Sequence, residues 1–345
     1  MQLAQRKTKI LKAIVESYIE SGEPVGSKAL CSALDFPVSS ATVRNEMAEL
    51  AELGYLIQPH TSAGRIPSES GYRLYVNSMM ERKKLPGDVK ALIFDALDSA
   101  ADNPEKLLRR ASELTAELTR SAVAATTPFS SDSRIHYLKF VQTGRQTCMV
   151  VLITSEGLIK NRLFKCDYII TPDIVRIFET IFNRELEGRP VHSITPAFVQ
   201  TLAVVMGELA MLVPSALAAI MDACADVSNF SLAVSGRVNL LFTDDSDVYS
   251  MRELMVFLHS DEALESLIMS IGGKDKIAIG SETGFGALSN YSVITVPYSI
   301  ETSSGGVITA IVPMRTDYAY VQSVLEYTSE CVSRLMRSLL MLEGD

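Results

Sequence analysis

Hydrogen-bonding side chains are concentrated in one short stretch near the N-terminus, at Ser39, Ser40, Thr42, Arg44 and Asn45. Asparagine can pair with adenine through two hydrogen bonds, arginine with guanine or a phosphate, and threonine with a thymine methyl group or a phosphate. Serine hydroxyls at the start of a helix add donors at its positive end, where anions bind. These residue types predict contacts with DNA.

A helix must present these side chains on one face. Its opposite face is apolar at helical spacing, and Gly54 is typical of the residue that follows a helix end. The exposed face is shallow because Ala41 and Ala48 flank Asn45, which suits a helix that enters the major groove. The apolar residues are Val43, Met47, Leu50 and Leu53.

Two further helices are expected before this one, at 3–19 and from Ser27 to Leu34. The segment 35–38 contains a proline and predicts the tight turn of a helix-turn-helix. A small helical bundle with no role in DNA binding fits the same pattern. The first helix carries basic residues on its polar face, namely Arg6, Lys7, Lys9 and Lys12.

A hairpin is predicted after Gly54, with strands at 55–57 and 65–67. Its tip is small and uncharged, which suits a loop that lies along a phosphate backbone or enters a minor groove. We therefore expect the hairpin to be a DNA-binding wing, although an ordinary hairpin has the same pattern. The candidate contacts in it are His60, Thr61, Ser62 and Arg65.

Charge is distributed unevenly along the chain. The formal net charge is -9 for all 345 residues, but residues 1–85 contain 11 Lys and Arg against 9 Asp and Glu, so +2. The remaining 21 basic and 32 acidic residues (32-11 and 41-9) give -11. Any contact with polyanionic nucleic acid is therefore expected in the N-terminal quarter.

Several blocks of sequence follow one another in a specific order. They are Gly22–Ser27, Ser39–Met47, Leu53–Leu56 and Gln58–Pro67, with a looser continuation at Tyr72–Val76, Gly280–Glu282 and Asp317–Tyr318. This pattern resembles the HrcA family. The resemblance implies a negative regulator of class I heat-shock (chaperone) operons that binds the CIRCE inverted-repeat operator as a homodimer, with the chaperonin GroEL maintaining its activity.

The body of the chain is predicted as the rest of an α+β multidomain protein. Residues 1–80 form the winged helix-turn-helix, 81–103 a linker and helix, and 171–273 an inserted, mainly helical domain. By the resemblance, 104–170 plus 274–345 form a GAF-like α/β domain with an antiparallel sheet, and the insertion is the dimerising domain. The strands expected in that single sheet are 135–142, 147–154, 158–165, 276–280, 292–299 and 307–313.

Catalytic and metal-binding patterns are missing from the sequence. It has no nucleophile elbow, phosphate-binding loop or zinc-protease helix, and the nearest imitation, Gly280, Gly284 and Gly286, is typical of turns. The five cysteines are scattered and predict buried thiols in a reducing cytoplasm. We therefore expect no enzyme activity, no cofactor and no metal, and a cytoplasmic protein that associates with the nucleoid when bound to DNA.

Other interpretations stay open on the sequence alone. A GAF-like domain allows a ligand-responsive regulator in which a metabolite reorients the DNA-binding heads. A winged helix can also serve as a protein-interaction module. The apolar stretch 197–225 raises the question of a membrane span, but Glu208 and Pro214 interrupt it, and we expect it to form core or a dimer interface.

Overall fold

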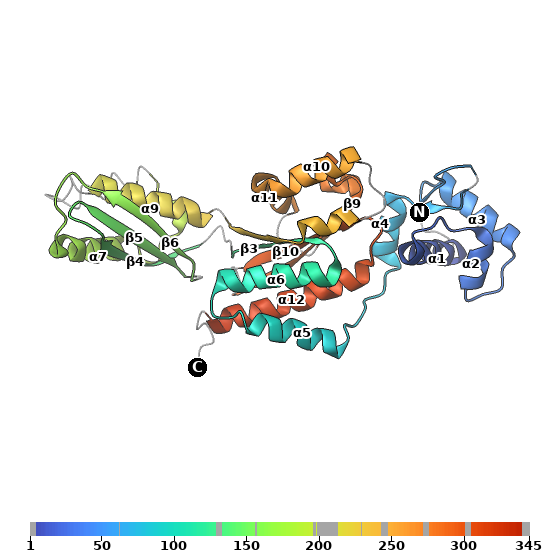
Figure 1. The fold of residues 1–345 in the computed structure, drawn as a ribbon, viewed down its shortest axis with the longest axis horizontal. Helices are drawn as coiled ribbons and strands as arrows, with labels where there is room; N and C mark the ends of the chain where they lie inside the picture. The colour runs from blue at the N-terminus through green and yellow to red at the C-terminus, as the bar shows by residue number, and fades with distance from the viewer. Residues whose placement is uncertain are drawn as a thin grey trace.

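The computed structural model shows an elongated molecule of three lobes in a row (Figure 1). The N-terminal lobe lies at one end, a lobe with its own small sheet lies at the other, and a five-stranded sheet with helices on both faces lies between them. The structure describes residues 5–61, 63–128, 133–155, 157–195, 198, 213–228, 230–242, 248–271, 276–300 and 305–339.

The N-terminal lobe has the predicted order of elements. Helices α1 (Gln5–Ser21), α2 (Ser27–Ala33) and α3 (Ser40–Glu52) are followed by the strands β1 (Leu56–Ile57) and β2 (Ile66–Pro67), which pair antiparallel, and by α4 (Glu69–Ser78). Apolar residues spaced three or four apart bring α1 and α3 together, because burial of such a stripe drives helices to pack. The fully buried residues include Ile10, Leu11, Ile14, Val43 and Leu50.

The central lobe is built on a sheet of order β7-β3-β10-β9-β8 whose paired strands are all antiparallel. On one face lie α5 (Gly87–Asp98), α6 (Pro104–Thr119) and α12 (Tyr318–Leu339), and on the other lie α10 (Val248–His259) and α11 (Asp261–Ile271). The strands are β3 (Ala122–Thr126), β7 (Leu232–Ser235), β8 (Lys276–Ile279), β9 (Tyr291–Ser299) and β10 (Gly305–Pro313).

A second sheet corrects the predicted body. Strands β4 (Ile135–Gln142), β5 (Thr147–Thr154) and β6 (Ile159–Lys165) closely match the predicted ranges, but they pair only with one another among the described residues. The expectation that they share one sheet with the later strands is wrong. The chain leaves the five-stranded sheet after β3 and returns to it at β7, next to β3, so the segment between them folds as a unit of its own.

Two helices pack on the second sheet. These are α7 (Pro172–Leu186) and α9 (Val213–Ser228), and they enclose an apolar core that includes Phe140, Phe178 and Phe182. The prediction of a separate, mainly helical insertion at 171–273 also needs correction, because α10 and α11 pack on the five-stranded sheet, whereas α7 and α9 pack on the three-stranded one. Apolar helix faces choose a sheet by three-dimensional complementarity, which sequence order does not reveal.

The cysteines agree with the expected environment of buried thiols. Cys148, Cys166, Cys224 and Cys331 are buried and Cys31 is half-buried, and each is a thiol and not half of a disulfide. Burial raises the pKa of Cys224 to about 12 and that of Cys148 to about 11, so both are protonated at neutral pH.

The apolar stretch 197–225 lies largely outside the described residues. Its last part belongs to α9, whose buried side chains complete the core over the second sheet. In the part of the chain that the structure describes, no helix combines the length and apolar character needed to cross a membrane. A group of His, Cys, Asp or Glu side chains arranged to hold a metal ion is likewise not found there.

Candidate DNA interface

The start of α3 is held by its own hydroxyl groups. Ser39 is the N-cap: its Oγ accepts a hydrogen bond from the backbone N–H of Thr42 at 3.1 Å and lies 2.8 Å from the Thr42 Oγ1. An N-cap of this kind satisfies a backbone donor that the helix itself leaves open. Two of the predicted DNA contacts therefore also define where the helix begins.

Ser40 joins the two helices of the helix-turn-helix. Its Oγ lies 3.1 Å from the Oγ of Ser27, the first residue of α2. The N-cap of α2 is Gly26, which has no side chain to cap the helix, so α2 begins at Ser27 as expected. The hydroxyl pair fixes the spacing between α2 and the N-terminal turn of α3.

Arg44 and Asn45 project from α3 into solvent. Both are exposed, as is Ala41 beside them, whereas Val43 and Met47 on the other side of the helix are buried. Within the described part of the chain, no hydrogen bond or ion pair engages either side chain. Their donors and acceptors are therefore available to base edges or phosphates.

Two acidic residues of α3, Glu46 and Glu49, turn toward α1. Glu46 is 5% exposed and forms an ion pair with Arg6, whose Nε lies 2.8 Å from its Oε1, while Lys7 lies 2.7 Å from Glu49. The hydrogen bond from Lys7 to Glu49 raises the pKa of Lys7. These pairs hold Glu46 and Glu49 away from the exposed Arg44–Asn45 side of α3, and they neutralise two of the cations on the polar face of α1, Arg6 and Lys7.

The tip of the hairpin is shaped by one glutamine. The Nε2 of Gln58 donates to the backbone oxygens of Thr61 at 3.0 Å and Ala63 at 3.1 Å, and the N–H of Ala63 donates to the oxygen of His60 at 2.9 Å. His60 and Thr61 are exposed at this tip. The remaining predicted tip residue, Ser62, lies outside the described residues.

The returning strand is bound to the segment before α2. The backbone N–H and oxygen of Arg65 both pair with Val25 at 2.9 Å, and a Cβ on Gly64 would lie 2.4 Å from the oxygen of Val25. A glycine is therefore required for this close approach. Arg65 is half-buried and stands at the base of the hairpin beside Ile66, and its enclosed Nε has no hydrogen-bond partner among the described residues.

Two residues near this candidate interface were not predicted from the sequence. Gln58 lies in a recognised block but its type gave no sign that it would hold the hairpin tip. Lys28 is exposed at the second position of α2, where a cation can contact the DNA backbone. A single lysine on a short helix does not by itself indicate a DNA contact in the sequence.

Comparison with known proteins identifies relatives along nearly the whole chain. The family model described as "HrcA protein C terminal domain" matches residues 105–321. Two curated proteins, both named heat-inducible transcription repressor HrcA, are similar over nearly their full length. The one from Clostridioides difficile is 32% identical over 97% of this chain and 100% of its own. The one from Lachnoclostridium phytofermentans is 33% identical over 94% of this chain and 95% of its own.

One solved structure supports the arrangement of the fold. It is described as a hypothetical protein at 2.2 Å resolution, and it aligns with a TM-score of 0.63 and 26% identity over 98% of this chain and 100% of its own. Similarity therefore covers the N-terminal lobe as well as both sheets. The chain belongs to the HrcA family of heat-inducible transcription repressors.

Proposed function

We propose that this repressor is a dimer that reads an inverted-repeat operator of the CIRCE type with two winged helix-turn-helix heads. In each head α3 enters the major groove, where Asn45 and Arg44 contact base edges and Ser39, Ser40 and Thr42 approach the phosphates. The β1–β2 hairpin acts as the wing and brings His60, Thr61, Ser62 and Arg65 to the backbone. Repression follows because the bound dimer occludes the promoter.

The observation that carries this proposal is the polarity of α3. Its Arg44–Asn45 side is exposed and unengaged in the described structure, whereas its glutamate side is bound to Arg6 and Lys7. A groove-reading helix needs this division, because a carboxylate facing phosphates is repelled. The fixed cap at Ser39 supports it further, since the reading residues then stand at defined positions of the first two turns.

The open face of the β4–β5–β6 sheet supports the dimer. Side chains on the other face are buried under α7 and α9, so by alternation polar residues are expected on the open one. Instead it carries two apolar rows, with one lysine and one asparagine between them, and no described helix packs on it. The rows are Tyr137, Ile153 and Ile159, and Val141, Met149 and Leu163.

A second copy of the chain is the occupant that fits this face. Its two apolar rows flank the central row Lys139, Val151 and Asn161, so a two-fold axis through Val151 in the plane of contact brings apolar rows against apolar rows. An inverted repeat demands the same two-fold symmetry of its reader. We therefore propose this sheet, and not a helical insertion, as the centre of the dimerising domain, and the five-stranded sheet with its helices as the GAF-like domain.

Replacing Leu163 by glutamate tests the dimer. Leu163 is 67% exposed in the protomer, so the substitution leaves the fold intact, but in the dimer it places an uncompensated charge in an apolar contact twice. We expect a monomer in sedimentation velocity, and loss of preference for the inverted repeat. Tyr249→Glu, at an 80% exposed site on α10, is the control and should remain dimeric. A Leu163→Glu dimer of wild-type strength contradicts the proposed interface.

Heat and the chaperonin enter through the stability of the folded dimer. We propose that heating unfolds the body, and that chaperonin restores the competent fraction, so operator occupancy follows the amount of free chaperonin. Protein heated and returned to low temperature should then bind operator more strongly in a gel shift when GroEL and ATP are added. Equal recovery with a chaperonin mutant that cannot bind substrate would exclude this part of the proposal.

A further inference from the structure

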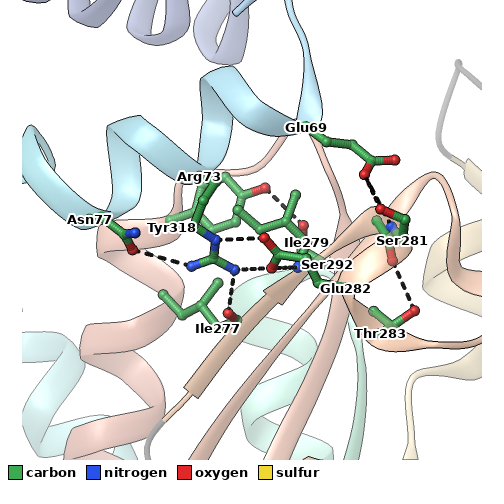
Figure 2. Close-up of polar contacts among 11 residues, drawn as sticks. Glu69, Arg73, Asn77, Ile277, Ile279, Ser281, Glu282, Thr283, Ser292 and Tyr318 are labelled. Atoms are coloured by element: carbon green, nitrogen blue, oxygen red, sulfur yellow. Dashed lines mark hydrogen bonds and ion pairs between the residues drawn. The ribbon is translucent and has the colours of Figure 1, made fainter. Parts of the chain in front are cut away.

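Helix α4 connects the DNA-binding head to the turn η4 (Gly280–Thr283), which follows β8 at the edge of the central sheet (Figure 2). Arg73 of α4 forms a two-pronged ion pair with Glu282, with its Nε 2.8 Å from Oε1, and its Nη2 also donates to the backbone oxygen of Ile277 at 2.6 Å. Planar pairs of this type fix direction as well as distance. The contact thus ties one helix of the head to the body.

A second contact lies one turn away on the same helix. Glu69 accepts hydrogen bonds from the hydroxyl of Ser281 at 2.5 Å and from its backbone N–H at 3.2 Å. Gly280 has a φ of +53°, and a Cβ there would lie 2.5 Å from the carboxyl carbon of Glu69. The turn therefore presents its backbone closely to the head, which explains why a glycine, a serine and a glutamate follow one another here.

The carboxylate of Glu282 is held in its charged form. Partial burial raises its pKa, but hydrogen bonds from Arg73 and from the N–H of Ile279 outweigh that effect, so that its pKa lies below the ordinary value. The Ile279 bond, of 2.9 Å, also orients the carboxylate toward α4. The pair is therefore intact at neutral pH.

Apolar packing and a third polar contact complete the junction. The rings of Tyr72 and Tyr318 lie 5.9 Å apart, and one cluster of buried hydrophobic residues continues from the head into the central lobe. Arg315 reaches the backbone oxygen of Ile19 at the end of α1, at 3.4 Å. Because α1 and α4 both contact the body, the head has a defined orientation relative to the body and is not attached to it by a flexible linker alone.

Docking in this way leaves the reading surface open. Arg44, Asn45, His60 and Thr61 are all exposed with the head attached, and α3 lies on the side of the head away from the body (Figure 1). The junction therefore does not block DNA. We infer that Arg73, Glu282 and Glu69 are positioning residues that set the distance and angle between the two reading helices of the dimer, and thereby the half-site spacing that the repressor accepts.

The physical consequence is selectivity for spacing, and it rests on the proposed function of an inverted-repeat reader. Insertion of about five base pairs turns one half-site to the opposite side of the duplex, because B-DNA repeats about every 10.5 base pairs. Heads with a fixed orientation cannot follow this change. Heads held less firmly at the junction can follow it more readily, but they then spend less time in the orientation that the native spacing requires.

The test compares full-length wild type with Arg73→Ala and Glu282→Ala by gel shift. The probes are the native inverted repeat, the same repeat with about five additional base pairs between its half-sites, a single half-site and a scrambled fragment. Glu282 lies in the body, so Glu282→Ala removes the same contact and leaves the fold of the head intact. It therefore still tests the inference if Arg73→Ala disturbs α4. Arg176→Ala is the control, since Arg176 is an exposed helical arginine paired with Asp173.

Wild type and Arg176→Ala should prefer the native spacing, and both junction variants should lose about tenfold in affinity for it while keeping wild-type affinity for the half-site. Their preference for the native spacing over the lengthened repeat should fall by a similar factor. Junction variants with unchanged spacing preference overturn the inference and leave the proposed function standing. A wild type that does not prefer the inverted repeat over the scrambled fragment overturns the proposed function itself.

Discussion

Replacing Asn45 or Arg44 by alanine is expected to weaken operator binding by about 1 to 3 kcal/mol per half-site, because each loses hydrogen bonds to a base edge. The loss appears twice in a symmetric complex. Neither side chain contributes to the core or to an ion pair of the described structure, so the thermal unfolding of both variants should match wild type. Fluorescence anisotropy with labelled operator measures the affinity, and circular dichroism the unfolding.

The two substitutions should differ in their base dependence. Asn45→Ala should relax discrimination at an adenine. Arg44→Ala should relax discrimination at a guanine if Arg44 contacts a base; if it contacts a phosphate, the substitution should weaken binding to all sequences equally and lower the salt dependence of binding. Arg176→Ala, at an exposed position of α7, provides a matched control that should bind like wild type. Wild-type operator affinity in both α3 variants would show that this face does not read DNA.

Replacing Phe182 by alanine should have the largest effect on heat stability. Its ring is fully buried in the core between the second sheet and α7, 5.4 Å from the ring of Phe140 and 5.6 Å from that of Phe178. Removing such a ring leaves a cavity and costs about 3 to 5 kcal/mol. Because this lobe carries the proposed dimer face, operator binding should be lost at a temperature lower by about 10 °C or more.

The measurement is operator binding after brief heating at a series of temperatures, alongside calorimetry. Ile177→Ala, on the same helix but 39% exposed, is the control and should shift the transition far less. At low temperature the Phe182 variant should bind with wild-type affinity, since it does not touch the head. If operator binding were lost at the wild-type temperature, the stability of this lobe would not determine the response to heat.

Local patterns predicted the elements well. The ranges expected for β4 and β5 agree with the structure, and α2 begins at Ser27, as expected. Alternation, caps and helical spacing arise from contacts between neighbours in sequence, and these are visible without a structure. For the same reason the sequence predicted that Arg44 and Asn45 lie on the side of α3 opposite Val43 and Met47.

Strand pairing and contacts between residues far apart in the chain could not be predicted from the sequence. Strand β3 was missed because its Ala122–Thr126 run is small, buried on both faces and without alternation. Which strands share a sheet depends on closure of long loops, so the split between β4–β6 and the central sheet had no local sign. The partner of Glu46, Arg6, stands 40 residues away, and the contacts of Gly280–Glu282 with α4 span more than 200.

The most direct test of the central claim is a salt-titrated gel shift of the purified full chain. The probes are a chaperone promoter fragment that carries the inverted repeat and a fragment of the same length with that repeat scrambled. A dimer that reads the repeat should bind the first at least about a thousandfold more tightly. Equal, strongly salt-dependent binding to both fragments would contradict sequence-specific repression and leave only a general affinity for DNA.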